Sequence, residues 1–195
     1  MTSHHYRKKG TMRSTFRSGA VATAVLLSLS APVFAQSDKV VADVLRDIDQ
    51  VQGKLLQLAK AMPEASYGWK AGEARTTSEV FQHVAADNYF LPTAIGAAAP
   101  DMTGIKTGDY KTVQAYETRK ASRDEVIAEL EKSFAHLKQA LSGITPAQLS
   151  ESINMFGQTF TRQQFLILTA THLHEHLGQM IAYARANNIK PPWSN

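Results

Sequence analysis

Three histidines fall close together near the end of the chain, in the run His172-Leu-His-Glu-His176. On an α-helix each residue turns the side chain by about 100°, so His172 and His176 lie about 40° apart on one face. His174 points about 200° away from His172 on the same helix. Two imidazole nitrogens on one helix face are common ligands for a single divalent cation. The spacing therefore predicts that His172 and His176 bind a metal and that His174 is a surface residue.

A metal site needs at least a third ligand, and an earlier segment of the chain offers His83. This histidine shares an apolar stripe with Val80 and Val84, whereas His136 falls on the polar side of its own predicted helix. Three histidines with an open fourth position are typical of a catalytic zinc site. A single histidine on an apolar stripe is also compatible with a buried, hydrogen-bonded core residue, and that alternative stays open for His83.

Three further polar residues lie near the predicted ligands. Asp87 comes one turn after His83 and is interpreted either as an acceptor that orients a ligand ring or as a polar residue at the mouth of the site. Gln179 returns to the site face and could bond a ligand or a metal-bound water, or be a plain helix-end residue. Glu175 does not match the helical H-E-x-x-H zinc motif, so it is not assigned as a protease base. Asp87 and Glu175 are the candidates for proton transfer.

Apolar residues recur at spacings of three and four along four segments, which predicts four amphipathic helices. Their predicted ranges are 38–62, 76–97, 122–143 and 161–187. Ser or Thr followed three residues later by Glu or Gln predicts a capping box at the start of the last three. Pro92 should kink or shorten the second helix.

Residues 98–121 show no strong period and form a long connection for a compact domain. Residues 154–161 are predicted to form a turn or a small hairpin. These features predict an all-α four-helix bundle with a long crossover between helices two and three. The core of such a bundle is a common place for a metal site built from facing side chains.

The first 35 residues have the features of a bacterial secretory signal peptide. Five basic residues precede a short apolar run, and small residues Val33 and Ala35 occupy the −3 and −1 positions of a cleavage site. We therefore predict a signal peptide at 1–35, a mature domain at 36–195 and a periplasmic or secreted location. An uncleaved membrane anchor is the alternative, although the apolar run is shorter than the ~20 residues that a spanning helix needs.

Composition excludes several other classes of function. The chain contains no cysteine, which rules out disulfides, thiolate zinc sites and cysteine nucleophiles. The formal charge of +4 arises from the predicted signal peptide, and residues 36–195 are slightly acidic. Nucleic acid is therefore not expected as a partner, nor is a stable membrane span after signal cleavage. A small-molecule substrate is compatible with the site, and a homodimer stays open.

Two sequence motifs are similar to those of the DinB/YfiT-like family of four-helix-bundle metalloproteins. The first is Trp69-Lys-x-Gly72 followed by the helix start that carries His83, and the second is His172-x-x-x-His176-x-Gly178-Gln179. The resemblance covers about residues 38–193. It implies a bundle with one long crossover and a divalent cation, zinc or nickel, held by His83, His172 and His176 and completed by water or substrate.

Some members of that family are transferases or isomerases that use small thiols such as bacillithiol or mycothiol, and many have no assigned reaction. This chain differs in carrying a predicted export signal, which separates it from cytosolic thiols. We therefore consider three hypotheses: a metal-dependent transferase or hydrolase, a non-catalytic metal-binding or stress-related interaction module, and a helical partner-binding domain whose histidines pair with carboxylates and bind no metal.

Overall fold

The structure is a computed structural model that describes residues 1–2 and 33–194. The basic and apolar regions of the predicted signal peptide lie outside the described residues, so that prediction stays untested. The first described helix begins at Val33, just before the predicted cleavage point. Among the described residues, no helix is both long and apolar enough to cross a membrane.

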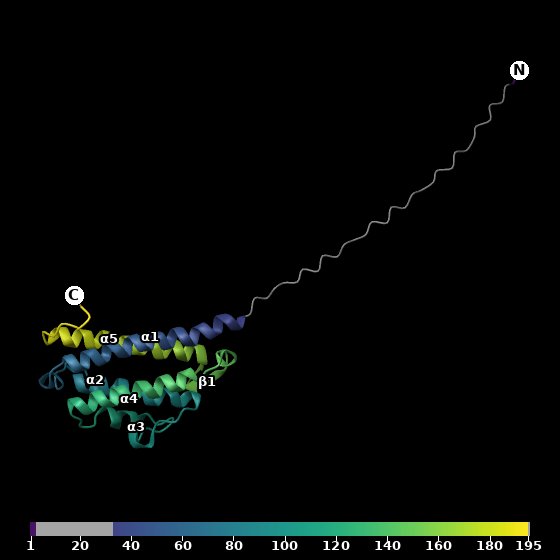
Figure 1. Cartoon of the computed structure of the whole chain (residues 1–195). Helices are drawn as coiled ribbons and strands as arrows, with labels where there is room; N and C mark the ends of the chain where they lie inside the picture. Colours follow the sequence, from purple (N-terminus) through teal and green to yellow (C-terminus); the bar gives the residue numbers. More distant parts are fainter. Residues whose placement is uncertain (3–32, 195) are drawn as a thin grey trace. The chain divides into compact units, whose positions relative to one another are not determined.

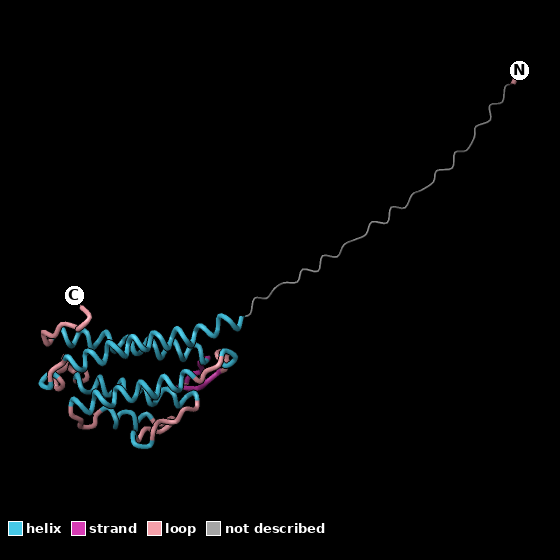
Figure 2. The backbone as a smooth tube through the Cα atoms, in the orientation of Figure 1, coloured by secondary structure: helices cyan, strands magenta, loops and turns pink. Residues whose placement is uncertain are grey.

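Four long helices form the body of the domain (Figures 1 and 2). They are α1 (Val33–Ala61), α2 (Thr77–Phe90), α4 (Arg123–Ser142) and α5 (Arg162–Ala186). Helix α1 packs against α4 and α5, and α2 packs mainly against α4 and also against α5. The predicted all-α four-helix bundle is confirmed.

Local signals set the starts of three of these helices. At α2 the Thr76 hydroxyl accepts the Glu79 N–H at 3.2 Å, and the Glu79 carboxylate accepts the Thr76 N–H at 2.7 Å. Ser122 with Glu125 and Thr161 with Gln164 form the same reciprocal pairs at α4 and α5. Each capping box satisfies two helix N–H groups that otherwise lack partners. The predicted capping boxes are therefore confirmed.

Helix α2 ends earlier than residue 97. Its α-helical part stops at Phe90, and a 3-10 segment continues from Leu91 to Ile95. Pro92 has no N–H to donate and disfavours α-helical geometry in the residue before it. The early end that Pro92 predicts is confirmed, and it turns the chain out of the bundle toward the long connection.

The long connection makes α2 and α4 run in the same direction. Asn88 near the end of α2 hydrogen-bonds Ser133 in the second half of α4 at 3.0 Å, while Gln82 near the start of α2 is bonded by Arg119 just before α4 begins. In Figure 1 the chain between these two helices includes α3, which lies at the lower edge of the view. This arrangement is the predicted crossover.

A short helix inside the crossover was not predicted. Helix α3 (Tyr110–Glu117) begins where the Asp109 side chain accepts the Lys111 N–H at 3.1 Å. It packs along α2 and buries Val113, Tyr116 and Glu117. The prediction of an irregular connection was therefore wrong over these residues, and the difference brings Glu117 into the interior.

A two-stranded antiparallel hairpin precedes α5. Strands β1 (Ser152–Met155) and β2 (Gln158–Thr161) pair with Met155 opposite Gln158 and are drawn in magenta in Figure 2. The two turn residues, Phe156 and Gly157, have φ values of 53° and 72°. The predicted hairpin is confirmed.

Candidate metal centre

Three imidazole rings from two helices converge inside the bundle. His83 comes from α2, and His172 and His176 come from α5. The ring centroid of His176 lies 4.5 Å from each of the other two, and those of His83 and His172 are 5.3 Å apart. One nitrogen of each ring lies within 4.8 Å of the others, a spacing that could hold a metal ion. The structure therefore brings together the three histidines that the sequence singled out.

His176 has one nitrogen held in place and the other left free. Its Nδ1–H donates to Gln179 Oε1 at 2.9 Å, and its Nε2 is buried without a hydrogen-bond partner. Burial is the main cause that lowers the pKa of His176 to about 4, so its ring is neutral near pH 7. A neutral buried imidazole with an unpaired lone pair is costly unless a cation or water binds it.

Gln179 is fixed by a second hydrogen bond. Its Nε2 donates to the Tyr183 hydroxyl at 3.2 Å, and that hydroxyl donates to the carbonyl of Arg75 at 2.9 Å. The amide orientation of Gln179, and hence the tautomer of His176, is set by this chain of partners. Gln179 thus lies where the sequence predicted, on the site face of α5.

His83 is oriented by a buried carboxylate. Its Nδ1–H donates to Glu117 Oε1 at 2.6 Å, which leaves Nε2 facing the other two rings as an acceptor. Arg75 contacts the second oxygen of Glu117 at 3.1 Å. Burial raises the pKa of Glu117, but the hydrogen bond and charge of His83, with the charge of Arg75, outweigh it and hold the pKa below its ordinary value.

Asp87 lies on the same side of the rings as their free nitrogens. Its Oδ2 is 2.7 Å from His172 Nε2 and 3.4 Å from His83 Nε2. An acceptor that orients a ligand ring contacts the nitrogen opposite the metal, as Glu117 does for His83. Asp87 instead faces the centre, where it could bind a cation beside the histidines or accept a proton from a molecule held there.

A second set of residues, His83, Asp87 and Glu117, also has the spacing of a metal site. Both oxygens of Glu117 already have strong partners in His83 and Arg75. Breaking those bonds leaves the buried imidazole N–H of His83 without an acceptor and removes the ion pair with Arg75, which is unfavourable. In the three-histidine group, the Nε2 of His176 has no hydrogen bond that metal binding would break. This group is therefore the better candidate for the metal site.

The remaining predicted residues lie away from the centre. His174 is on the exposed face of α5, where its Nε2 contacts both carboxylate oxygens of Asp47 on α1 at 3.0 and 2.8 Å. Glu175 is exposed, and no described residue forms a hydrogen bond with its side chain. His136 is half-buried against the Tyr89 ring, so its predicted position on a polar face was wrong.

Sequence reasoning missed Glu117, Arg75 and Tyr183. Glu117 lies in the connection that shows no clear period, and Arg75 lies in the loop before α2. A usable signal was present, because Val113, Tyr116 and Glu117 follow the Asp109 cap with helical spacing. A carboxylate on the buried face of such a short helix is a sign that it pairs with a buried basic group.

Replacing Glu117 by glutamine is expected to weaken zinc binding by about 10–100-fold, because the ring of His83 loses its anionic partner. Glutamine keeps the size of the side chain, so the fold should be retained. Competition with a chromophoric chelator measures the affinity. Glu131→Gln, on an exposed position of α4, is the matched control and should bind zinc like the wild type; equal affinities for both variants would contradict the role of Glu117.

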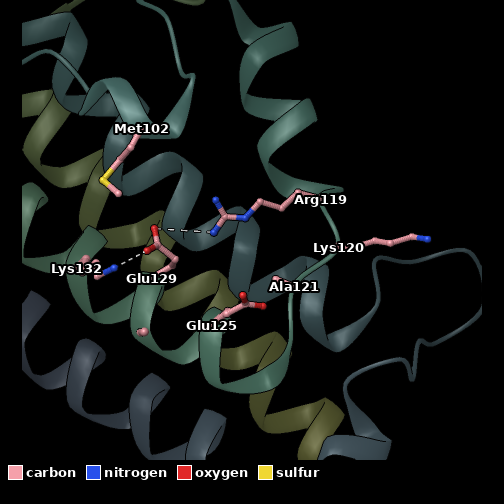
Figure 3. Close-up of a pocket in the computed structure, with 8 residues that line it drawn as sticks. Met102, Arg119, Lys120, Ala121, Glu125, Glu129 and Lys132 are labelled. Carbon is pink, nitrogen blue, oxygen red and sulfur yellow. Dashed lines mark hydrogen bonds and ion pairs between the residues drawn. The ribbon is translucent and has the colours of Figure 1, made fainter.

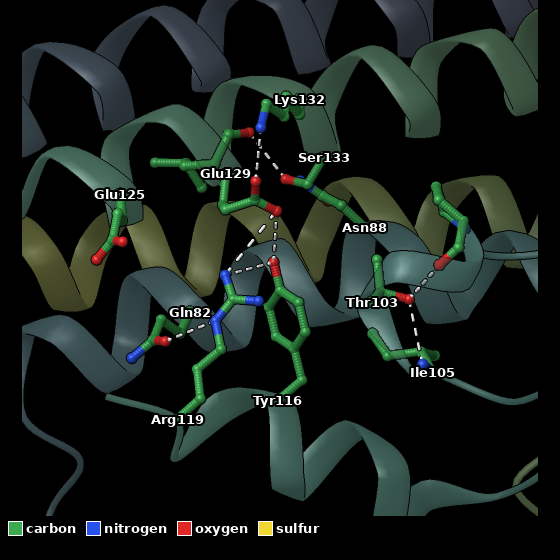
Figure 4. Close-up of polar contacts among 12 residues, drawn as sticks. Gln82, Asn88, Thr103, Ile105, Tyr116, Arg119, Glu125, Glu129, Lys132 and Ser133 are labelled. Carbon is green, nitrogen blue, oxygen red and sulfur yellow. Dashed lines mark hydrogen bonds and ion pairs between the residues drawn. The ribbon is translucent and has the colours of Figure 1, made fainter. Parts of the chain in front are cut away.

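A network around Arg119 holds this part of α3 in place (Figure 4). The Arg119 guanidinium donates to Gln82 Oε1 at 3.3 Å and to the Tyr116 hydroxyl at 3.0 Å. Tyr116 in turn donates to Glu129 Oε2 on α4 at 3.2 Å. Since Glu117 lies between Tyr116 and Arg119, these bonds to α2 and α4 fix its position.

A separate hollow of about 290 Å³ lies beside the same network (Figure 3). Three of the charged groups that line it are paired, since Glu129 contacts Lys132 at 2.8 Å and Arg119 at 3.9 Å. Glu125 accepts the Ser122 N–H in the capping box of α4, and ion pairs and caps of this kind are structural contacts. The hollow therefore offers no chemistry that competes with the histidine centre.

Comparison with solved structures supports the fold. A DinB-like protein from Bacillus cereus ATCC 10987 is 18% identical, with a TM-score of 0.62 over 79% of this chain and 97% of that one. A DinB-like protein from Bacillus subtilis is 17% identical, with a TM-score of 0.56 over 75% of this chain and 92% of that one. Identity at this level shows the fold alone.

A mycothiol-dependent maleylpyruvate isomerase has a similar fold. It is 17% identical, with a TM-score of 0.57 over 72% of this chain, and the chain spans 60% of the isomerase's length. No curated protein matches the sequence. The sequence profile of the DinB superfamily matches residues 47–180, a range that contains all three histidines. The chain therefore belongs to the DinB superfamily.

Proposed function

We propose that this protein is an exported metal-dependent enzyme, a transferase or hydrolase, that acts on a small molecule. His83, His172 and His176 hold a divalent cation, zinc or nickel. Such a cation supplies Lewis acidity and lowers the pKa of a bound water or thiol. Three neutral ligands leave its positive charge uncompensated, which favours that chemistry.

The observation that carries this proposal is the free Nε2 of His176. The Nε2 of His136 is also buried without a partner, but His136 belongs to neither group of described residues with the spacing of a metal site. At His176, Gln179 holds Nδ1, and Nε2 is buried, unpaired and directed among two further imidazoles. Nitrogen donors of this type match the preferences of zinc and nickel.

The chain's own residues have separate tasks in the proposed reaction. Glu117 and Gln179 orient the rings of His83 and His176 through their Nδ1–H groups. Asp87 accepts a proton at Oδ2 from the molecule bound at the centre, because this oxygen faces the free ring nitrogens. His172 would be one of the three residues that hold the cation, and its Nε2 now contacts Asp87 Oδ2 at 2.7 Å.

Access to the centre supports a catalytic role over a purely structural one. The His172 side chain is 23% exposed and that of Arg75, which contacts Glu117, is 42% exposed, so the His172 side of the centre reaches solvent. A structural metal site is normally closed by four protein ligands. We assign the exported location from the predicted signal peptide. N-terminal sequencing of the processed protein tests this assignment, and the expected first residue is Gln36.

Elemental analysis of residues 36–195, purified without a histidine tag, tests the proposal directly. We expect about one zinc or nickel ion per chain. The loaded protein should hydrolyse 4-nitrophenyl acetate or transfer a small thiol to 1-chloro-2,4-dinitrobenzene faster than the same protein treated with chelator. A bound ion with no chelator-sensitive turnover of any small substrate favours the non-catalytic metal-binding module, and absence of metal favours the partner-binding domain.

A further inference from the structure

An aromatic-walled cavity lies at the far end of α2 from its capping box. It has a volume of about 410 Å³ and is lined by Phe90, Tyr110 and Phe156, with Thr93, Thr107 and Asn154 supplying polar atoms. The centroids of the three rings are 6.0 to 6.5 Å from one another. Volume and composition are those of a site for a small organic molecule.

Phe156 is poorly suited to its place in the hairpin. It is the first residue of a two-residue turn and has a φ of 53°, a conformation that Asn or Gly adopts far more readily than Phe. Its side chain is nevertheless 57% exposed. An exposed aromatic ring in a strained backbone position contributes little to folding, and such strain is typical of functional sites.

The cavity and the histidine centre both adjoin one stripe of residues along α2. Along α2, His83, Asp87 and Phe90 follow one another at helical spacing, and along α3 Glu117 and Tyr110 are two turns apart. Seven positions, about 10 Å of helix, separate His83 from Phe90 on α2, and the same spacing separates Tyr110 from Glu117 on α3. His83 contacts Glu117 at one end and Phe90 packs against Tyr110 at the other, so the two helices run side by side between the centre and the cavity.

Tyr110 lies near both the cavity and the histidine centre. Its ring is a wall of the cavity, and its hydroxyl lies close enough to the centre to be affected by the charges there. Burial raises the pKa of Tyr110, the carboxylates of Asp87 and Glu117 raise it further, and Arg75 lowers it. Tyr110 therefore lines the cavity and lies within reach of the charged groups beside the centre.

We propose that this cavity binds the planar, apolar group of the substrate, about 10 Å from the polar head that the histidine centre holds. The inference rests on the proposed function and names its substrate class: a small molecule with an aryl group joined by a short chain to a metal-binding head. Phe90, Tyr110 and Phe156 contact the aryl group, and the Tyr110 hydroxyl contacts the linking chain.

Hydroxamates of two kinds test this proposal, because the hydroxamate head binds zinc and only one kind carries an aryl group. Calorimetric titration of the zinc-loaded protein compares acetohydroxamate with 4-phenylbutyrohydroxamate. We expect the aryl compound to bind at least about tenfold more tightly, since its ring is removed from water in the cavity.

Phe156→Asn is the informative variant, because asparagine suits the turn while removing the ring. The aryl advantage should fall to about threefold or less, binding of acetohydroxamate should stay unchanged, and the Tm should not decrease. Ile167→Asn, which removes a similarly exposed apolar side chain (50%) from α5 away from the cavity lining, is the matched control and should keep the full advantage.

The possible failures are distinguishable. Zinc uptake and acetohydroxamate binding without an aryl advantage, or an advantage that survives in Phe156→Asn, overturn the proposed cavity and leave the proposed function intact. Failure of the wild-type protein to take up zinc or to bind acetohydroxamate overturns the proposed function and this inference with it.

Discussion

Replacing His176 by alanine is expected to reduce zinc affinity by more than about 100-fold, beyond the loss caused by removing a residue that only orients a ligand. His176 contributes a buried Nε2 that has no other partner. Alanine removes that donor and leaves two histidines, which are too few for a tight zinc site. Zinc content after dialysis and competition with a chromophoric chelator measure the effect.

The neighbouring histidine provides the matched control for this experiment. His174→Ala changes the same residue type two positions away, but the His174 ring contacts Asp47 on the surface and not the centre. Its zinc affinity should equal that of the wild type. Because His176 is only 6% exposed and its loss could disturb packing, His172→Ala is measured alongside. Normal zinc content in both His172→Ala and His176→Ala would show that these rings do not hold the ion.

The metal-free protein is expected to lose stability as the pH falls from 6.5 toward 4. Burial lowers the pKa of His176 from 6.5 to about 4, so in this interval the unfolded chain takes up a proton that the folded chain does not. Proton uptake by the unfolded state alone favours unfolding. The resulting loss of folding stability is therefore absent above pH 6.5 and grows as the pH falls. The shift corresponds to at most about 3 kcal/mol.

Urea unfolding in the presence of chelator, repeated between pH 7 and 4.5, measures this dependence. His176→Gln is the appropriate reference, because glutamine does not titrate and its profile should be flatter. Burial also lowers the pKa of His136, which adds a loss of the same sign to both proteins and cancels in the difference. Parallel profiles for the two proteins would contradict the expected titration of His176.

The main helices could be predicted because their signals are local. Capping boxes at Thr76, Ser122 and Thr161 give the helix starts, and Pro92 gives the end of α2. Each of these depends on a few neighbouring residues and on backbone hydrogen bonding. The pair His172 and His176 is local in the same sense, since one helical turn separates the two residues.

The carboxylate partner of His83 could not be predicted because it depends on tertiary packing. Glu117 and His83 are 34 residues apart and meet only because α3 folds back along α2. A helix as short as α3 has little periodicity of its own, and its position depends on contacts such as those of Tyr116 and Arg119. Helical spacing likewise does not predict the direction in which the Asp87 carboxylate faces.

Two of the four long helices, α2 and α5, supply all three rings, and about ninety residues of sequence separate the first ring from the last. No growing or partly folded chain contains the whole donor set until α5 has docked against α2. Capture of the proposed ion would thus be a late step that accompanies completion of the bundle. For a chain that crosses a membrane unfolded, as the predicted leader implies, the supply of ions outside the cytoplasm then decides which element the protein carries.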